Sequence, residues 1–294
     1  MTENLRGAAL MMGSMATFTL NDACLKLLAQ GLPTFQAVTL RGVGVITLLL
    51  ILAHLTGALR QPIPKADRPA AYGRSLMEIC AFLPFVIALT HMPLANITAI
   101  LQVLPLTITA AGAVFLGERV GPRRWAAIAL GFLGVLLIIR PGPAGFDHWS
   151  LLVLLAVAFI TARDLLTRRL SPQVPSLKVA ILTATGITAL GIALSLGDPW
   201  QPIAYHQGAL IAGASLFILG GYVFSIMAMR HGEVAVVTPF RYTAILWGLL
   251  LGLLVFGDWP DAVTLLGAAL VVASGLYTFW RETRATRLNS AAPQ

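Results

Sequence analysis

The stretch THMPLANITAILQVLPLTITAAGAVFLGE, from Thr90 to Glu118, returns in altered form as RHGEVAVVTPFRYTAILWGLLLGLLVFGD, from Arg230 to Asp258. Each copy follows an apolar segment, runs for about 20 apolar residues and ends at a glycine followed by an acid. Placed in one register, the copies share His91/His231, Ala95/Ala235, Thr98/Thr238, Leu106/Leu246, Gly112/Gly252, Gly117/Gly257 and the acids Glu118/Asp258. The two stretches therefore predict an internal repeat made of helices.

The composition is that of a membrane protein. Of 294 residues, 57% are hydrophobic and only 11% are charged, whereas a soluble domain carries about a quarter charged residues. The net charge of +8 comes from bases confined to short loops, which argues against binding to nucleic acid. Cys24 and Cys80 both fall inside apolar segments, so we expect packed core residues there and neither a disulfide nor a metal site.

Spanning a bilayer takes about 20 apolar residues in a helix. Ten segments meet this requirement and are separated by turns rich in glycine and proline. They cover residues 6–29, 35–59, 70–91, 94–117, 123–140, 149–168, 176–196, 208–230, 234–257 and 261–280. The connections leave no room for a soluble domain, and we expect the polar tail, residues 281–294, to be disordered and cytoplasmic.

The bases also predict an orientation. Most of the 20 Lys and Arg residues fall at alternate ends of the spans, which places both termini in the cytoplasm by the positive-inside rule. Each repeat then holds five helices, residues 1–144 and 145–280, and two copies of an odd unit must cross the membrane in opposite directions. The first spans of the two halves also share identical residues in one register, at Leu10/Leu152, Ala16/Ala158, Thr19/Thr161 and Asp22/Asp164. Inverted repeats around a central cavity are the build of many secondary transporters.

Two runs carry a resemblance to a known family. FVIALTHMPLANITAILQVLPLTITAAGAVFLGERV (Phe85 to Val120) precedes GFLGVLLIIRPG, and FSIMAMRHGEVAVVTPFRYTAILWGLLLGLLVFGD (Phe224 to Asp258) precedes GAALVVASG. Over essentially the whole chain this pattern resembles the drug/metabolite transporter superfamily, EamA type, and within it the aromatic amino-acid exporter branch. The resemblance implies a ten-helix carrier that exports amino acids or other metabolites. The second copy departs from the first, because its acid is Asp258 and its proline, Pro239, comes earlier than Pro105.

Polar side chains mark a candidate substrate cavity on the two repeated segments. These side chains are too polar to face lipid, where each polar group without a hydrogen-bond partner costs several kcal/mol. Such a side chain either forms a hydrogen bond to another helix of the bundle or lines a cavity. The first alternative is favoured for the threonines and the second for the Gln, Arg and Tyr side chains. The set comprises Thr98, Gln102, Thr238, Arg241 and Tyr242. Pro105 and Pro239 are expected to free backbone carbonyls for the same cavity.

Charged residues inside the spans need a partner or a function. Glu78, midway along the third span, is either a substrate or coupling carboxylate or a neutral acid hydrogen-bonded within the bundle. Asp22 and Arg41 lie at similar depth near one mouth, and Asp164 and Arg241 near the other. Each pair is either a gate that opens with its mouth or a static packing contact. Lys26, Arg163 and Lys178 are near enough to the boundaries to snorkel, so no function is expected of them.

These patterns predict a secondary transporter of the inner (plasma) membrane that exports small polar metabolites, most simply amino acids. Charges of both signs suit a zwitterion. The alternatives are an importer or exchanger of another metabolite, such as a nucleotide sugar, and an integral-membrane enzyme. Enzyme signatures such as His-Glu-x-x-His, Gly-x-Ser-x-Gly and the Walker loop are absent from the sequence, and we expect no cofactor. The expected partners are the small-molecule substrate, membrane lipid and, as a candidate coupling ion, the proton.

Overall fold

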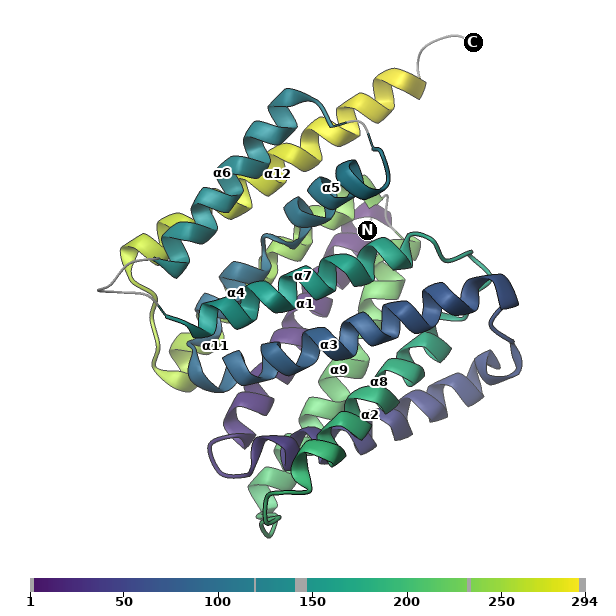
Figure 1. The fold of residues 1–294 in the computed structure, drawn as a ribbon, viewed down its shortest axis with the longest axis vertical. Helices are drawn as coiled ribbons and strands as arrows, with labels where there is room; N and C mark the ends of the chain where they lie inside the picture. Colours follow the sequence, from purple (N-terminus) through teal and green to yellow (C-terminus); the bar gives the residue numbers. More distant parts are fainter. Residues whose placement is uncertain (1–2, 119, 141–146, 232–233, 291–294) are drawn as a thin grey trace.

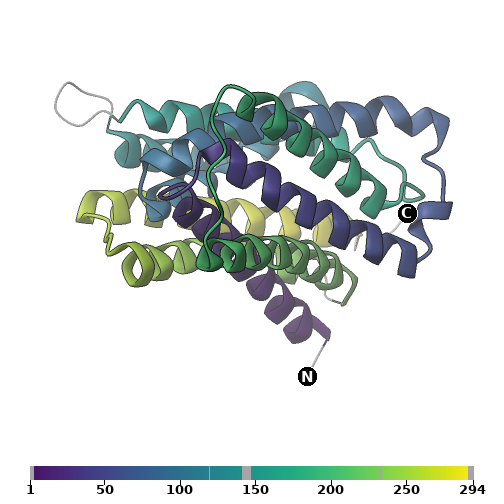
Figure 2. The ribbon, with the colours of Figure 1, turned by 90° about the horizontal axis from the view of Figure 1, so that it is seen from below.

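The computed structural model describes residues 3–118, 120–140, 147–231 and 234–290, and within these ranges every regular element is a helix. The long helices run in roughly one direction, so that the connections gather at the two ends of a bundle (Figures 1 and 2). The first half contains α1 (Glu3–Leu28), α2 (Thr34–Leu55), α3 (Arg68–His91), α4 (Leu94–Leu101), α5 (Leu104–Phe115) and α6 (Pro122–Ile139). The second contains α7 (Trp149–Thr167), α8 (Ser176–Ser195), α9 (Tyr205–His231), α10 (Val234–Val237), α11 (Ala244–Phe256) and α12 (Ala262–Ser290).

The lengths of the helices match the thickness of a membrane. Nine helical segments of the described residues are long and apolar enough to cross a bilayer. The remaining long helix, α1, has 26 residues, and the polar pair Asn21 and Asp22 lowers its hydropathy. The all-helical, multi-pass membrane fold predicted from the sequence is confirmed, and the count of spans comes to ten when α1 is included.

The fourth and ninth spans are both broken near a proline. α4 ends at Leu101 and α5 begins at Leu104, with Pro105 in its first turn. In the ninth span a short 3₁₀ helix, Thr238–Thr243, separates α10 from α11 and carries Pro239 in its first turn. Proline has no N–H to donate and its ring crowds the preceding turn, so a continuous α-helix cannot pass through it without distortion. The sequence predicts a single span in each place, residues 94–117 and 234–257, with a proline that frees backbone carbonyls.

Helices of the two halves pack in matched pairs. α1 packs against α9 and α3 against α7, which join the first span to the eighth and the third to the sixth. α2 packs against α8, α4 against α11 and α6 against α12, which join each span to its counterpart five spans later. Exchanging the halves converts this set of contacts into itself. A two-fold relation between halves produces that pattern.

The glycine–acid ending of each repeat is a helix cap. Gly117 and Gly257 both have a positive φ, at 70° and 71°. In each copy the N–H that follows this glycine donates to a glycine carbonyl six residues back: Glu118 to Gly112 at 3.2 Å and Asp258 to Gly252 at 2.9 Å. A left-handed residue reverses the chain and lets it satisfy carbonyls that the last helical turn leaves open.

Two glycines bring α6 and α12 close together, and the two helices lie side by side (Figure 1). A Cβ added at Gly134 would lie 2.7 Å from the backbone oxygen of Gly267, and one added at Gly267 would meet the oxygen of Gly134. Small residues permit this approach, and in lipid such packing is a main source of helix association. α12 then continues to Ser290, although the sequence predicts residues 281–294 to be disordered. Ala, Glu, Arg and Leu, which favour helix, are frequent in this segment.

We predict that Gly117→Ala and Gly257→Ala each destabilise the protein by about 1–2 kcal/mol, because an L-residue with a Cβ is strained in the left-handed region. The melting temperature in detergent micelles measures the effect. Gly121→Ala is the matched control, since its φ is −72° and no atom lies within 4 Å of its added Cβ. Equal melting temperatures for all three variants would contradict the cap assignment.

Candidate functional site

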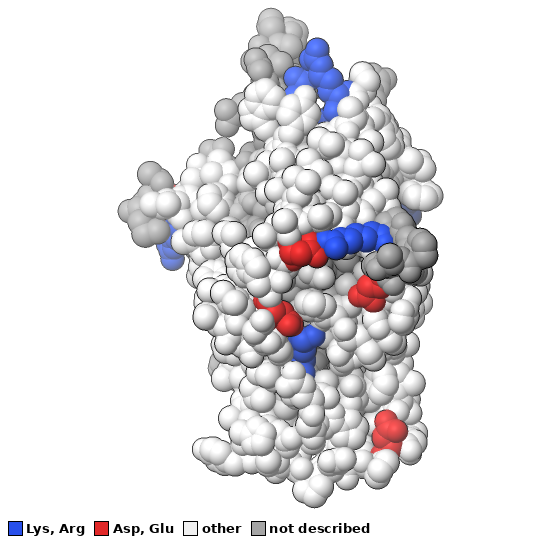
Figure 3. Space-filling view, turned by 90° about the vertical axis from the view of Figure 1, so that its left-hand side faces the viewer, with Lys and Arg blue, Asp and Glu red and all other residues white. Residues whose placement is uncertain are grey.

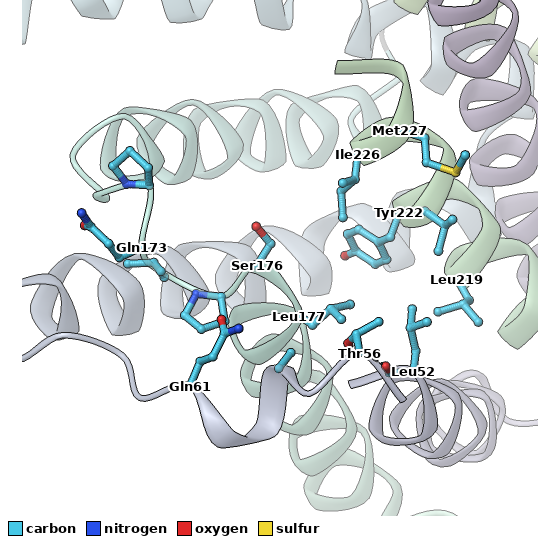
Figure 4. Close-up of a pocket in the computed structure, with 15 residues that line it drawn as sticks. Leu52, Thr56, Gln61, Gln173, Ser176, Leu177, Leu219, Tyr222, Ile226 and Met227 are labelled. Carbon is cyan, nitrogen blue, oxygen red and sulfur yellow. Dashed lines mark hydrogen bonds between the residues drawn. The ribbon is translucent and has the colours of Figure 1, made fainter. Parts of the chain in front are cut away.

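One face of α9 lines a hollow at the end of the bundle where α2 ends and α8 begins (Figure 4). Its volume is about 480 Å³, within the range of small-molecule sites. The residues from α9 recur at helical spacing, which places them on one face: Leu219, Tyr222, Val223, Ile226 and Met227. We call this space the α9 hollow. Leu52 of α2 and Leu177 of α8 complete its mainly apolar wall, and the hydroxyls of Tyr222 and Thr56 are its polar side-chain groups away from the mouth.

The mouth of the α9 hollow is polar. Gln61, Gln173 and Ser176 stand around it, from the connections that follow α2 and α7 and from the first turn of α8. A second, smaller hollow of about 240 Å³ adjoins it, since both are lined by Pro172, Val174 and Ser176. Arg74 of α3 lines this second hollow. The α9 hollow therefore adjoins a space that reaches the charged side chain of Arg74.

Arg74 belongs to a network of four charges, which we call the charge network. Glu78 on α3 forms ion pairs with two arginines, with Arg74 one turn earlier at 3.2 Å and with Arg163 of α7, which also donates a hydrogen bond to it at 3.1 Å. Arg163 also pairs with its neighbour Asp164 at 2.7 Å. Two bases and two acids balance one another, which is the condition for keeping charges at membrane depth. Glu78 therefore lies in contact with two guanidinium groups from two different helices.

Hydroxyl groups extend the charge network into a third helix. The Nε of Arg74 donates to the Thr167 hydroxyl at 3.1 Å, and its Nη1 donates to the hydroxyl of Thr183 on α8 at 3.5 Å. The Thr183 hydroxyl in turn donates to Ser75 at 3.0 Å. The charged side chains keep 16–23% of their surface accessible although Glu78 lies ten residues, about 15 Å, into its helix. Of the four charged side chains, Arg74 lines the second hollow, so the charge network borders that hollow through this residue.

A second buried cluster lies between α1 and α2. Arg41 donates to the side chain of Asn21 at 3.0 Å, and Asn21 in turn donates to Asp22 at 2.9 Å. The Arg41 guanidinium also lies over the ring of Phe82, 5.3 Å from its centre. The sequence predicted contact between Asp22 and Arg41; in the structure Asn21 bridges them.

The predicted residues of the broken spans are interior but line neither hollow. Thr98, Gln102 and Tyr242 are each 7% exposed. Thr98 donates to Leu94 and Gln102 to Thr98, so both bond the backbone of their own helix. The buried oxygens of Thr238 and Tyr242 have no hydrogen-bond partner among the described residues. The structure shows no ion pair for Arg241 in the described part of the chain, and Asp164 is paired with Arg163 instead.

Two of the residues expected to snorkel are bound inside the protein. Arg163 joins the charge network, as described above. The Lys26 ammonium donates to the carbonyl of Leu89 at 3.0 Å and to that of Met92, and it lies over the ring of Phe256. It therefore satisfies the carbonyls at the C-terminal end of α3, where a positive charge is favoured. The prediction of free, snorkelling side chains is wrong for both, because sequence spacing does not reveal a partner on a distant helix.

The end of the bundle opposite the α9 hollow is held by several contacts besides Lys26. Gln36 bonds both the N–H and the C=O of Gln201, and Gln207 donates to the carbonyl of Gly31. Arg140 pairs with Asp261, whose pKa is held below its usual range by the N–H of Thr264 and by the arginine. This side carries only a few charged residues on an otherwise uncharged surface (Figure 3).

Comparison with known proteins identifies the chain. A model of the EamA-like transporter family matches residues 5–140, and a riboflavin transporter of Rhizobium johnstonii is 32% identical over 69% of this chain and 67% of its own. The chain belongs to the EamA-like transporter family. It is thus a multi-pass membrane transporter of small metabolites, and the family resemblance stated from the sequence is confirmed.

Other members of the EamA-like family cover nearly the full chain. A pseudopaline exporter of Pseudomonas aeruginosa is 26% identical over 88% of this chain and 90% of its own. An S-adenosylmethionine uptake transporter of Rickettsia prowazekii is 22% identical over 95% and 94%. A crystal structure that is 17% identical shares the fold with a TM-score of 0.62 and covers 92% of this chain and 94% of its own. The named relatives thus include both exporters and importers.

We predict that Glu78→Gln destabilises this EamA-like transporter by about 1–3 kcal/mol, because it leaves two interior arginines with one fewer carboxylate. Glu118→Gln is the matched control: Glu118 also pairs with an arginine, Arg168 at 2.6 Å, but both side chains are more than 40% exposed. Its loss should cost less than about 1 kcal/mol. Melting temperatures in detergent compare the two, and an equal cost would show that the charge network is no more protected than the surface pair.

Proposed function

We propose that the chain is a secondary transporter that exports small polar metabolites, amino acids in particular, across the inner (plasma) membrane by alternating access. The charge network carries this proposal. A carboxylate group of a solute suits Arg74 and Arg163, and an ammonium group suits Glu78 and Asp164. A zwitterion can use both signs in one region. The absence of enzymatic activity belongs to the same proposal, since the relatives are named as transporters.

The proposed arrangement is two inverted repeats, residues 1–144 and 145–280, with both termini in the cytoplasm. The matched packing of spans supports the repeats. The caps support them too, because Gly117 and Gly257 have the same conformation and the same hydrogen bond at opposite ends of the bundle. Bases near the α9 hollow, such as Arg60, Arg68 and Arg169, support a cytoplasmic position for that end.

Alternating access then assigns roles to the buried pairs. The cluster of Asn21, Asp22 and Arg41 lies toward the end that Lys26, Gln36 and Gln207 hold, and we propose that it helps to close that side. Asp164 and Arg241 are proposed to close the other side, where the α9 hollow is open and Asp164 pairs with Arg163. Gln102, Tyr242, Thr98 and Thr238 remain proposed substrate contacts in a state that opens the broken spans.

Protons are the proposed coupling ion. Of the three interior carboxylates, Glu78 and Asp164 are in ion pairs, whereas Asp22 accepts from an amide and has no ion pair among the described residues. A carboxylate without a formal counter-ion in contact is the one that protonates most readily at depth. We therefore propose Asp22 as the proton-binding group.

A second candidate function is uptake. Relatives are named as riboflavin transporters and S-adenosylmethionine uptake transporters, and the α9 hollow is large enough for ring-bearing solutes of that kind. Import and export use the same fold, so only the direction of flux and the solute separate them.

We predict that inside-out membrane vesicles containing the protein accumulate labelled amino acids faster than vesicles without it. Uptake into inside-out vesicles corresponds to export from the cell. Uptake into right-side-out vesicles, which corresponds to import, is measured for comparison. Riboflavin and S-adenosylmethionine are tested in parallel, with and without an imposed pH gradient. Export of amino acids is contradicted if flux occurs only with the latter solutes, or only into right-side-out vesicles. Asp22→Asn should abolish the effect of the pH gradient.

We predict that Arg41→Ala and Arg241→Ala shift the conformational equilibrium in opposite directions. A reporter cysteine at Leu219, in a variant that lacks Cys24 and Cys80, is labelled by a hydrophilic maleimide through the α9 hollow. Arg41→Ala should lower the labelling rate and Arg241→Ala should raise it, since the typical coupling energy of about 1–3 kcal/mol corresponds to 5-fold or more. Arg60→Ala, at an exposed base, is the control. Shifts in the same direction would make both clusters static packing contacts.

A further inference from the structure

Tyr222 combines two features that occur at no other residue of the α9 hollow. Its ring forms part of the apolar wall, between Leu219 and Ile226, and its hydroxyl points into the space (Figure 4). No residue of the described chain makes a hydrogen bond with this hydroxyl. A phenol in such a place is free to bond a solute through its hydroxyl while its ring contacts the solute's apolar body.

The ring of Tyr222 is held from behind. Phe18 of α1 meets it edge to face, with centres 5.6 Å apart and planes at 89°. The adjacent Gly221 permits this contact, because a Cβ there would lie 2.6 Å from the Phe18 ring. Edge-to-face pairs are a favoured aromatic geometry and restrict the rotation of both rings. The orientation of the Tyr222 ring at the wall of the hollow is therefore restrained before any solute arrives.

The α9 hollow also adjoins the interior charges. The second hollow, which shares Pro172, Val174 and Ser176 with the α9 hollow, is lined by Arg74 of the charge network. A solute whose apolar part occupies the hollow therefore extends its polar groups toward the charge network. Such a solute must be longer than a small amino acid.

We propose that Tyr222 is the residue that sets the substrate specificity of the carrier, by selecting solutes that combine a charged head group with a planar ring system. The ring stacks on Tyr222 within the apolar wall of the α9 hollow, and the head group reaches the charge network. The proposal rests on the proposed function for the head group. The preference for a ring rests on Tyr222 and its surroundings alone.

The test measures dissociation constants of the full-length protein in detergent by isothermal titration, for three pairs of solutes that differ by a ring system. They are tryptophan and alanine, S-adenosylmethionine and methionine, and riboflavin and ribitol. The first two pairs have an amino-acid head group and the third has none. We expect the ring-bearing member to bind more tightly in at least one pair. Tyr222→Leu should weaken its binding about 10-fold and Tyr222→Phe about 3-fold, while the ringless partner changes by less than 2-fold.

Tyr205→Leu and Tyr205→Phe are the matched controls, because Tyr205 begins the same helix and is 96% exposed. They should leave every constant unchanged. The inference is overturned if the wild-type protein prefers no ring-bearing solute, or if Tyr222→Leu weakens both members of a pair equally. A ring preference confined to riboflavin would contradict the amino-acid head group of the proposed function and would leave the role of Tyr222 intact.

Discussion

A carboxylate between two arginines, Glu78 with Arg74 and Arg163, is the interaction on which the arrangement of the interior depends. Charges at membrane depth are costly unless they are paired, and here the partners come from two helices of different halves. α3 and α7 must therefore remain in contact through the whole of their inner portions, and their packing is among the closest in the bundle. The same pairing leaves accessible surface on each charged group, so a solute can meet charges that are already compensated.

The backbone imposes the second constraint. Every carbonyl and N–H within the hydrocarbon must find a partner, which makes helix ends and helix breaks the critical points. The protein meets this need with left-handed glycines at Gly117 and Gly257 and with Lys26, which satisfies carbonyls at the end of α3. The breaks at Pro105 and Pro239 adjoin α4 and α11, two helices that pack against each other.

Much of this organisation is predictable from local patterns. Apolar runs give the spans, prolines mark the two broken segments, and the glycine–acid ending predicts where the helices stop. The contacts between helices are harder to predict from the sequence. A lone arginine such as Arg163 has the same sequence pattern whether its side chain extends to the membrane surface or pairs with Glu78. The role of Tyr222 is not predictable from the sequence for a related reason: it lies in a mainly apolar helix, and only the neighbouring α2 and α8 make its face the wall of a hollow. The apolar stripe at helical spacing on α9 was the available signal, and on its own it indicates packing.

The contacts at the two ends differ in kind, and this difference bears on how the carrier changes state. The end opposite the α9 hollow is held mainly by hydrogen bonds to backbone groups, from Lys26, Gln36 and Gln207. Water can replace such bonds, and each contributes only about 0.5–1.5 kcal/mol net. Several of them together amount to a few kcal/mol, which is the scale over which a solute can shift a two-state equilibrium. Water cannot replace the ion pairs of the charge network in the same way inside the membrane. Separating Glu78 from its arginines there would leave charges uncompensated. The ends of the bundle are thus built to open, and the charged centre is built to stay assembled while they do.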